Sequence, residues 1–205
     1  MKLKFLTSNS KLRKDGIYGF DIPAYKSSTG FITCPLAKDC IANCYARQGT
    51  YVFKGVKAKY ERNLESTQND DFVLDMIIDI IESKAQIIRI HSSGDFYNRE
   101  YIAKWLYIIE SLPHVTFYAY TKSFSMFDYN VLPTNFKLIQ SQGGVHAIDE
   151  SKPHAKVFDS VDSFPSNYAN ASESDLVAVL NDKIALHYHG SKKHNGNAFI
   201  NKKAA

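Results

Sequence analysis

Three cysteines stand close together near the start of the sequence and nowhere else. Cys34, Cys40 and Cys44 lie within eleven positions, in a C-x5-C-x3-C spacing. Three thiolates without a fourth are what a cubane iron–sulfur cluster needs if one iron is to stay open for a small molecule, and soft sulfur ligands favour iron–sulfur over harder metals. We therefore expect these three residues to ligate a [4Fe–4S] cluster with one open iron.

Two other uses of the same cysteines stay open. A structural zinc site lacks its usual paired C-x2-C knuckles here and would need a distant fourth ligand such as His91, His146 or His187. The cysteines could also be inert or redox-active free thiols.

The elements that must position such a site follow in the middle of the chain. Two segments have the period of amphipathic helices, and three apolar runs read as strands. A further helix is expected over residues 52–66, Asn69 or Asp70 is expected to cap the helix that follows it, and Asn98 the next. The two helical segments and the three strands are "DFVLDMIIDIIESK", "NREYIAKWLYIIESL", "QIIRIHSSGDF", "HVTFYAYT" and "NFKLIQSQGG".

Alternation of strands and helices predicts parallel βαβ units. Three later segments, "AKVFDS", "DLVAVL" and "KIALHYH", read as short strands with little room for helices between them. A complete eightfold barrel takes about 250 residues. We therefore expect an α/β fold: a partial or distorted (β/α) barrel-like single domain over residues 1–189, with an N-terminal cysteine-rich loop at 32–51. The basic, polar residues 190–205 are expected to form a flexible tail.

Ligands of parallel α/β sheets bind at the carboxyl ends of the strands. Polar and small side chains gather at three such ends in this sequence. Arg89 stands in an otherwise apolar strand, so if it is buried it needs an acidic side chain or an anionic ligand as partner. Asp95 could bind an amine, orient a histidine or cap the next helix. The candidate ligand-binding residues are Arg89, His91, Ser93, Gly94, Asp95, Tyr120 and Lys122.

Charge is unevenly distributed along the chain. The net charge is +4, and residues 1–62 carry twelve Lys/Arg against four Asp/Glu. A basic region of this kind suits an anionic ligand, a nucleic acid or a negatively charged inorganic centre. No apolar run is long enough for a membrane helix or a secretory signal, and clustered unpaired cysteines suit a reducing compartment, so we expect a cytoplasmic protein.

Several motifs together resemble a known family. "CPLAKDCIANCYARQGTY", "YERN", "RIHSSGDFYNREYIAKW" and "FYAYTKS", spread over roughly residues 30–125, are similar to the phage gene product 88 family. A more distant resemblance is to radical S-adenosylmethionine enzymes, which place a three-cysteine motif before a Gly-Gly-Glu-like turn. Their usual motif is C-x3-C-x2-C, which is narrower than the spacing here. The resemblance to them makes S-adenosylmethionine a candidate ligand, and the first one implies a phage protein in the cytoplasm of its host.

Two functions follow as hypotheses. In the first, the protein is an iron–sulfur protein that carries out radical, reductive or electron-transfer chemistry on a small molecule at the open iron, supplied by an electron donor. In the second, it is a non-enzymatic phage accessory protein, stapled by zinc or a cluster, that binds nucleic acid or a host protein. The sequence identifies no catalytic residue for either.

Overall fold

The computed structural model describes residues 3–188 and 200–201. The predicted flexible tail therefore lies outside the described residues, apart from a two-residue strand. The elements alternate between strands and helices through the first two thirds of the chain. The helices and strands are α1 (Ser10–Lys14), β1 (Ile17–Phe20), α2 (Lys54–Thr67), α3 (Phe72–Ser83), β2 (Ile87–Ile90), α4 (Arg99–Ser111), β3 (Thr116–Thr121), β4 (Phe136–Ser141), β5 (His154–Phe158), β6 (Ala169–Asn170), α5 (Leu176–Leu180), β7 (Lys183–His187) and β8 (Ile200–Asn201).

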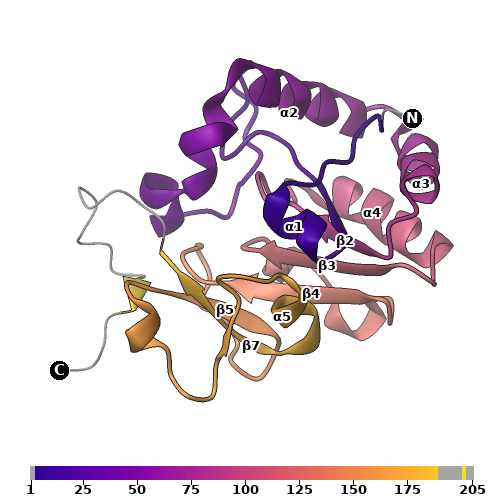
Figure 1. The fold of residues 1–205 in the computed structure, drawn as a ribbon. Coiled ribbons are helices and arrows are strands. Elements are labelled where there is room, and N and C mark those ends of the chain that lie inside the picture. The colour runs from indigo at the N-terminus through magenta and orange to yellow at the C-terminus, as the bar shows by residue number, and fades with distance from the viewer. Residues whose placement is uncertain (1–2, 189–199, 202–205) are drawn as a thin grey trace.

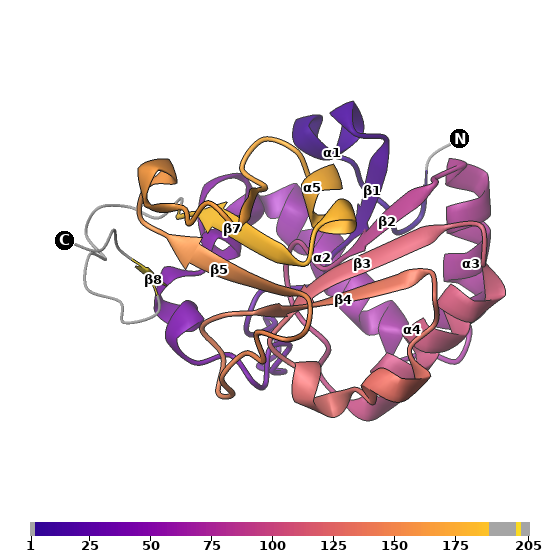
Figure 2. The same ribbon diagram turned by 90° about the horizontal axis from the view of Figure 1, so that it is seen from below.

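The strands form one parallel sheet that curls into a half-barrel (Figures 1 and 2). Its order is β1-β2-β3-β4-β5-β7-β6, with β8 paired to β5, and every ladder is parallel. The helices α3 and α4 pack side by side against one face of β1 to β4. This confirms the expected α/β, barrel-like architecture.

Residue alternation along the strands separates two cores. Ile88 and Ile90 of β2 belong to the larger core under α3 and α4, where Trp105 and Phe72 are fully buried. Side chains of the opposite parity point to the other face of the sheet, because successive residues of a strand alternate. The smaller core on that face contains Leu12, Ile17, Tyr118, Ile139, Ala155 and Ile184.

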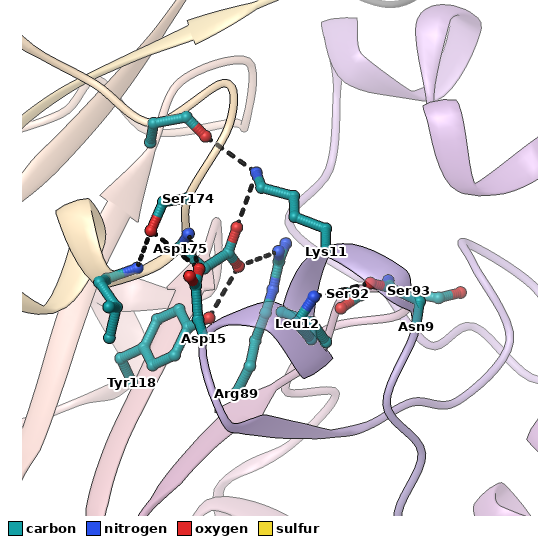
Figure 3. A network of polar contacts seen from close by, with 12 residues as sticks. Asn9, Lys11, Leu12, Asp15, Arg89, Ser92, Ser93, Tyr118, Ser174 and Asp175 are labelled. Carbon is teal, nitrogen blue, oxygen red and sulfur yellow. Dashed lines mark hydrogen bonds and ion pairs between the residues drawn. The ribbon is translucent and has the colours of Figure 1, made fainter.

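The two edges of the curled sheet are joined by the side chains of Lys11, which lies in α1, and of Asp15, which follows α1 (Figure 3). Lys11 Nζ donates to the carbonyl oxygen of Ala171 at 2.9 Å and pairs with Asp175 Oδ1 at 2.8 Å. Asp15 Oδ2 accepts from Asp175 N at 3.0 Å and from Ser174 Oγ at 2.8 Å. Since β1 and β6 are the first and last strands of the sheet, these contacts hold the half-barrel closed in place of a strand ladder.

Two of the local predictions were wrong, whereas the predicted cap of α4 was right. The segment "DLVAVL" forms α5, not a strand; Ser174 Oγ accepts from Leu176 N at 3.2 Å, which starts a helical turn. Helix α3 is preceded by Asp71 and has no side-chain cap, so the expected cap at Asn69 or Asp70 is absent. Asn98 does cap α4, accepting from Tyr101 N at 2.8 Å.

Within residues 3–188, no helix has the length and apolar composition needed to cross a membrane.

Candidate functional site

A pocket of about 340 Å³ opens inside the half-barrel, at the carboxyl ends of β2, β3 and β4. This volume is in the range of small-molecule sites, which span about 300 to 1,000 Å³. All seven residues predicted to bind a ligand line the pocket, and so do the three cysteines. The rule that places ligand sites at strand carboxyl ends therefore located the hollow correctly, while the ligand assignment itself stays a prediction.

The cysteines do not form the predicted metal centre. No group of three or more His, Cys, Asp or Glu side chains in the described part of the chain could hold a metal ion. The expected [4Fe–4S] cluster on Cys34, Cys40 and Cys44 is therefore wrong. The same finding contradicts three predictions that depended on the cluster or on zinc. These are the chemistry at an open iron, the iron–sulfur and zinc functions, and S-adenosylmethionine as a cofactor.

The reason lies in how the cysteine segment folds. It forms three short 3-10 helices, η1 (Asp39–Asn43), η2 (Tyr45–Arg47) and η3 (Gly49–Val52), not the single loop expected. Cys34 precedes them and its Sγ accepts from Tyr25 N at 3.2 Å, whereas Cys40 lies inside η1 and Cys44 between η1 and η2. The thiols line one pocket without converging on a common point.

The environment also keeps two of these thiols protonated. Burial raises the pKa of Cys34 to about 12, and the charge of Asp95 acts in the same direction. Burial likewise raises the pKa of Cys40 above its ordinary value, against the opposing effect of Lys122. Because the thiolate is the nucleophilic form, neither Cys34 nor Cys40 is activated at neutral pH.

The turn after β2 is built tightly against the first strand. His91 adopts a φ of 66° and Gly94 a φ of 86°, a region that favours glycine. A Cβ on Gly94 would lie 2.2 Å from Cγ1 of Ile22, so space also requires glycine there. The backbone N–H groups of Ser92 and Ser93 both donate to Asp21 Oδ1, at 2.6 and 2.8 Å. These constraints hold the turn in one conformation at the floor of the pocket.

Asp95 ties the ends of two strands together. Its Oδ1 accepts from Thr121 Oγ1 at 2.5 Å and from Phe96 N at 2.8 Å, and its Oδ2 accepts from Lys122 N at 2.9 Å. Asp95 does not cap α4, which was one of the roles considered for it, because Asn98 is the residue that caps this helix. Both carboxylate oxygens serve the polypeptide itself.

Arg89 has the acidic partner that its strand position requires. Its Nη1 pairs with Asp175 Oδ2 at 2.6 Å (Figure 3). Its Nη2 donates to Tyr45 OH at 3.2 Å, and its guanidinium lies 5.2 Å from the centre of the Tyr120 ring. Burial disfavours both ions, but the guanidinium holds the pKa of Asp175 well below its usual range. Tyr118 OH also donates a hydrogen bond to Asp175 Oδ2, at 2.7 Å.

Lys122 is a cation at the thiol-lined end of the pocket. Its Nζ donates to Ser141 Oγ at 3.1 Å and forms no ion pair within the described residues. Burial lowers the pKa of Lys122, but the charges of the neighbouring cysteines in their thiolate forms and of Asp95 outweigh that effect and the pKa is raised. The ammonium therefore stays charged at neutral pH.

His91 faces the apolar core on one side and the pocket on the other. Its Nε2 shares a hydrogen bond with Tyr101 OH at 2.9 Å, and the ring packs edge-on to Phe96. Burial lowers the pKa of His91 to about 3, so the imidazole is neutral at physiological pH.

Five buried polar atoms around the pocket lack a hydrogen-bond partner within the residues that the structure describes. A buried polar atom without a partner costs about 1–3 kcal/mol, so such atoms are rare unless something else satisfies them. These five are Arg89 Nε, His91 Nδ1, Ser92 Oγ, Tyr120 OH and Ser172 Oγ.

Sequence reasoning missed part of this site. Lys11, Tyr45 and Asp175 line the pocket and bind one another or Arg89, yet no local pattern marks them. Asp175 is separated from Arg89 by 86 positions, so only the closed half-barrel brings the two together. Ser92 could have been found, because it stands in the same strand-end turn as Ser93.

Fold and site together define an α/β half-barrel protein with a pocket of small-molecule size at its strand carboxyl ends. The family model described as "Gene product 88" matches residues 1–203, and the chain belongs to this family. Its relatives include the Gene 88 proteins of Mycobacterium phage D29 and Mycobacterium phage L5, which are 32% and 33% identical over 108 residues. Each alignment covers 47% of this chain and 45% of the relative, so the chain spans about half the length of the curated relatives it matches.

No solved structure matches the chain. The resemblance to radical S-adenosylmethionine enzymes receives no support from these comparisons, whereas the resemblance to the gene product 88 family is confirmed.

Proposed function

We propose that this protein binds a small molecule with an apolar body and several hydrogen-bond acceptors in the pocket inside the half-barrel. The observation that carries the proposal is that five buried polar atoms without a partner among the described residues belong to residues that line one pocket. A ligand that accepts hydrogen bonds from these atoms would remove a cost that the empty protein bears.

Among the described residues, one of these atoms can only donate a hydrogen bond. Arg89 Nε has no acceptor capacity, whereas the hydroxyls of Tyr120 and Ser92 can donate or accept. The carboxylates of Asp95 and Asp175 already accept hydrogen bonds on both oxygens from the protein's own groups. A ligand that satisfies Arg89 Nε must therefore bring an acceptor of its own.

The remaining wall suits an apolar, flat body. Tyr45, Tyr51 and Tyr120 contribute aromatic rings, and Leu12 and Leu186 are among the aliphatic residues that line the hollow. Pockets of this composition bury most of a ligand against apolar surface, and a few polar groups fix its orientation. Aromatic rings favour stacking or edge contacts with a planar molecule.

Two tyrosines of β3 give a matched test of the partnerless atoms. Tyr118 OH donates to Asp175, whereas Tyr120 OH has no partner among the described residues. We expect Tyr118→Phe to lower the free energy of unfolding of the ligand-free protein by about 1–3 kcal/mol, and Tyr120→Phe to leave it unchanged or raise it by up to about 1 kcal/mol. Urea denaturation followed by circular dichroism measures both.

Binding itself can be tested with toluene and benzamide, which share a ring but differ in acceptors. In 1H–15N correlation spectra, benzamide should shift the amides of residues around the pocket, more strongly than toluene does, and Tyr120→Phe should weaken its binding. If neither compound shifts these amides at millimolar concentrations, and Tyr120→Phe destabilises the protein as much as Tyr118→Phe, the pocket is not a ligand site.

As a phage-encoded binding protein it would act in the cytoplasm of the host cell. The three cysteines are free thiols, and a reducing cytosol keeps such thiols unpaired.

A further inference from the structure

The cations around the pocket differ in what neutralises them. Arg89 and Lys11 both pair with Asp175, at 2.6 and 2.8 Å, so their charges have a partner within the protein. Lys122 forms no ion pair in the part of the chain that the structure describes, and its one hydrogen-bond acceptor is the uncharged Ser141 Oγ. An ammonium carries three N–H donors, so two of those of Lys122 have no acceptor among the residues that the structure describes.

The surroundings of Lys122 hold its side chain in place. Gly144 packs against it so closely that a Cβ there would lie 3.0 Å from Cβ of Lys122 and 2.9 Å from the carbonyl oxygen of Leu36. Lys122 N is fixed by Asp95 Oδ2 at 2.9 Å. A lysine fixed at both its backbone and its amine has lost most of the rotamer freedom that usually opposes ligand binding.

The nearby groups do not replace an anionic partner. Asp95 attracts the ammonium from a longer range, and its oxygens are occupied by Phe96 N, Thr121 Oγ1 and Lys122 N. The thiols of Cys34 and Cys40 are protonated at neutral pH, because burial raises the pKa of both. Lys122 is half-buried, so its ammonium is only partly hydrated and is stabilised further by a partner that is itself charged and hydrogen-bonded.

We infer that the ligand of this pocket carries an acidic group, a carboxylate or a phosphate monoester, that binds Lys122 Nζ beside Ser141 Oγ. The uncharged acceptors of the ligand then face Arg89 Nε, Tyr120 OH and Ser92 Oγ, where the guanidinium already has an ion-pair partner in Asp175. This inference rests on the proposed function and adds the chemical class of the ligand and its orientation.

The test uses four compounds with one ring and different charge: benzamide, benzoate, phenyl phosphate and benzylamine. Dissociation constants come from amide shifts of the whole protein in 1H–15N spectra. We expect benzoate or phenyl phosphate to bind at least about tenfold more tightly than benzamide, which is what one charge-assisted hydrogen bond contributes, and benzylamine to bind least. Which acid binds more tightly distinguishes a carboxylate ligand from a phosphate ligand.

Three variants locate the acid. Lys122→Met, which removes the charge at similar length, should abolish the preference for acids over benzamide, and Lys122→Arg should keep part of it. Lys14→Met removes an exposed lysine outside the pocket and should leave the preference intact.

Failure of the inference differs from failure of the proposed function. If benzamide binds as tightly as the two acids, or if Lys122→Met keeps the preference, the pocket binds small molecules but Lys122 is not its acid-binding group. If none of the four compounds binds the wild-type protein, both proposals are overturned. If Lys122→Met does not fold, the wild-type comparison of acids with benzamide still tests whether the ligand is acidic, and Lys122→Arg still tests whether the acid lies on Lys122.

Discussion

The buried imidazole of His91 makes the stability of this protein depend on pH. His91 is 3% exposed and sits between Phe20, Phe96 and Tyr101, so protonation would place a charge in an apolar environment. Burial lowers its pKa to about 3 in the folded protein, whereas an unfolded histidine has a pKa of 6.5. The folded state therefore binds fewer protons than the unfolded state between these two values.

The sign and size of the effect follow from this difference. The stabilisation is complete above the unfolded pKa and is lost as the pH falls through that value towards the folded pKa, because only the unfolded state gains the proton. Between about pH 7.5 and about pH 5, one such histidine lowers the free energy of unfolding by about 2 kcal/mol.

The variant His91→Asn isolates this contribution. Asparagine tolerates the left-handed backbone that His91 adopts, with a φ of 66°, and does not titrate. Urea denaturation of both proteins at about pH 7.5 and about pH 5 should show the wild type losing about 2 kcal/mol more than the variant between the two conditions. Equal losses in the two proteins would show that His91 titrates normally in the fold.

Two further substitutions test how the pocket is built. Asp175→Asn should lower the free energy of unfolding by about 3–5 kcal/mol in a thermal or urea experiment, because it leaves the largely buried Arg89 unpaired. Asp75→Asn, in the exposed pair with Lys4, should lower it by less than about 1 kcal/mol. Similar losses in the two variants would mean that the Asp175 pair does not hold the half-barrel. Gly94→Ala should destabilise the protein by about 2 kcal/mol or more, since Gly94 has a φ of 86° and an added Cβ would meet Ile22. Gly55→Ala in α2 should instead stabilise the protein by up to about 1 kcal/mol, because an added Cβ there meets no other atom. A Gly94→Ala protein as stable as the wild type would mean that the turn after β2 is less constrained than its geometry indicates.

The sequence was most informative where local pattern and tertiary packing agree. The run "IIRI" forms β2 with Ile88 and Ile90 in the core beneath α3 and α4. Arg89, between them, points to the opposite face, where its predicted acidic partner lies. Strand polarity then placed the polar turn after β2 at the pocket without any knowledge of long-range contacts.

The sequence failed where one residue type has several uses. Cysteines spaced like metal ligands line the pocket on separate turns, because the fold of the η1 to η3 segment decides where they point. A five-residue apolar run such as "LVAVL" suits a strand or a helix equally, and in the structure a single hydrogen bond from Leu176 N to Ser174 Oγ accompanies the helix. The role of Asp175 depends on contacts with Lys11 and Arg89 that cross most of the chain.

The most direct measurement of the central claim is a crystal structure of the protein grown with phenyl phosphate, and a second one grown with benzoate. In at least one of them we expect the ring against the tyrosines of the pocket, the acidic group on Lys122 Nζ, and a hydrogen bond to at least one of Tyr120 OH, Arg89 Nε and Ser92 Oγ. Pockets that hold only ordered water, bonded to these same atoms at saturating concentrations of both compounds, would contradict the claim.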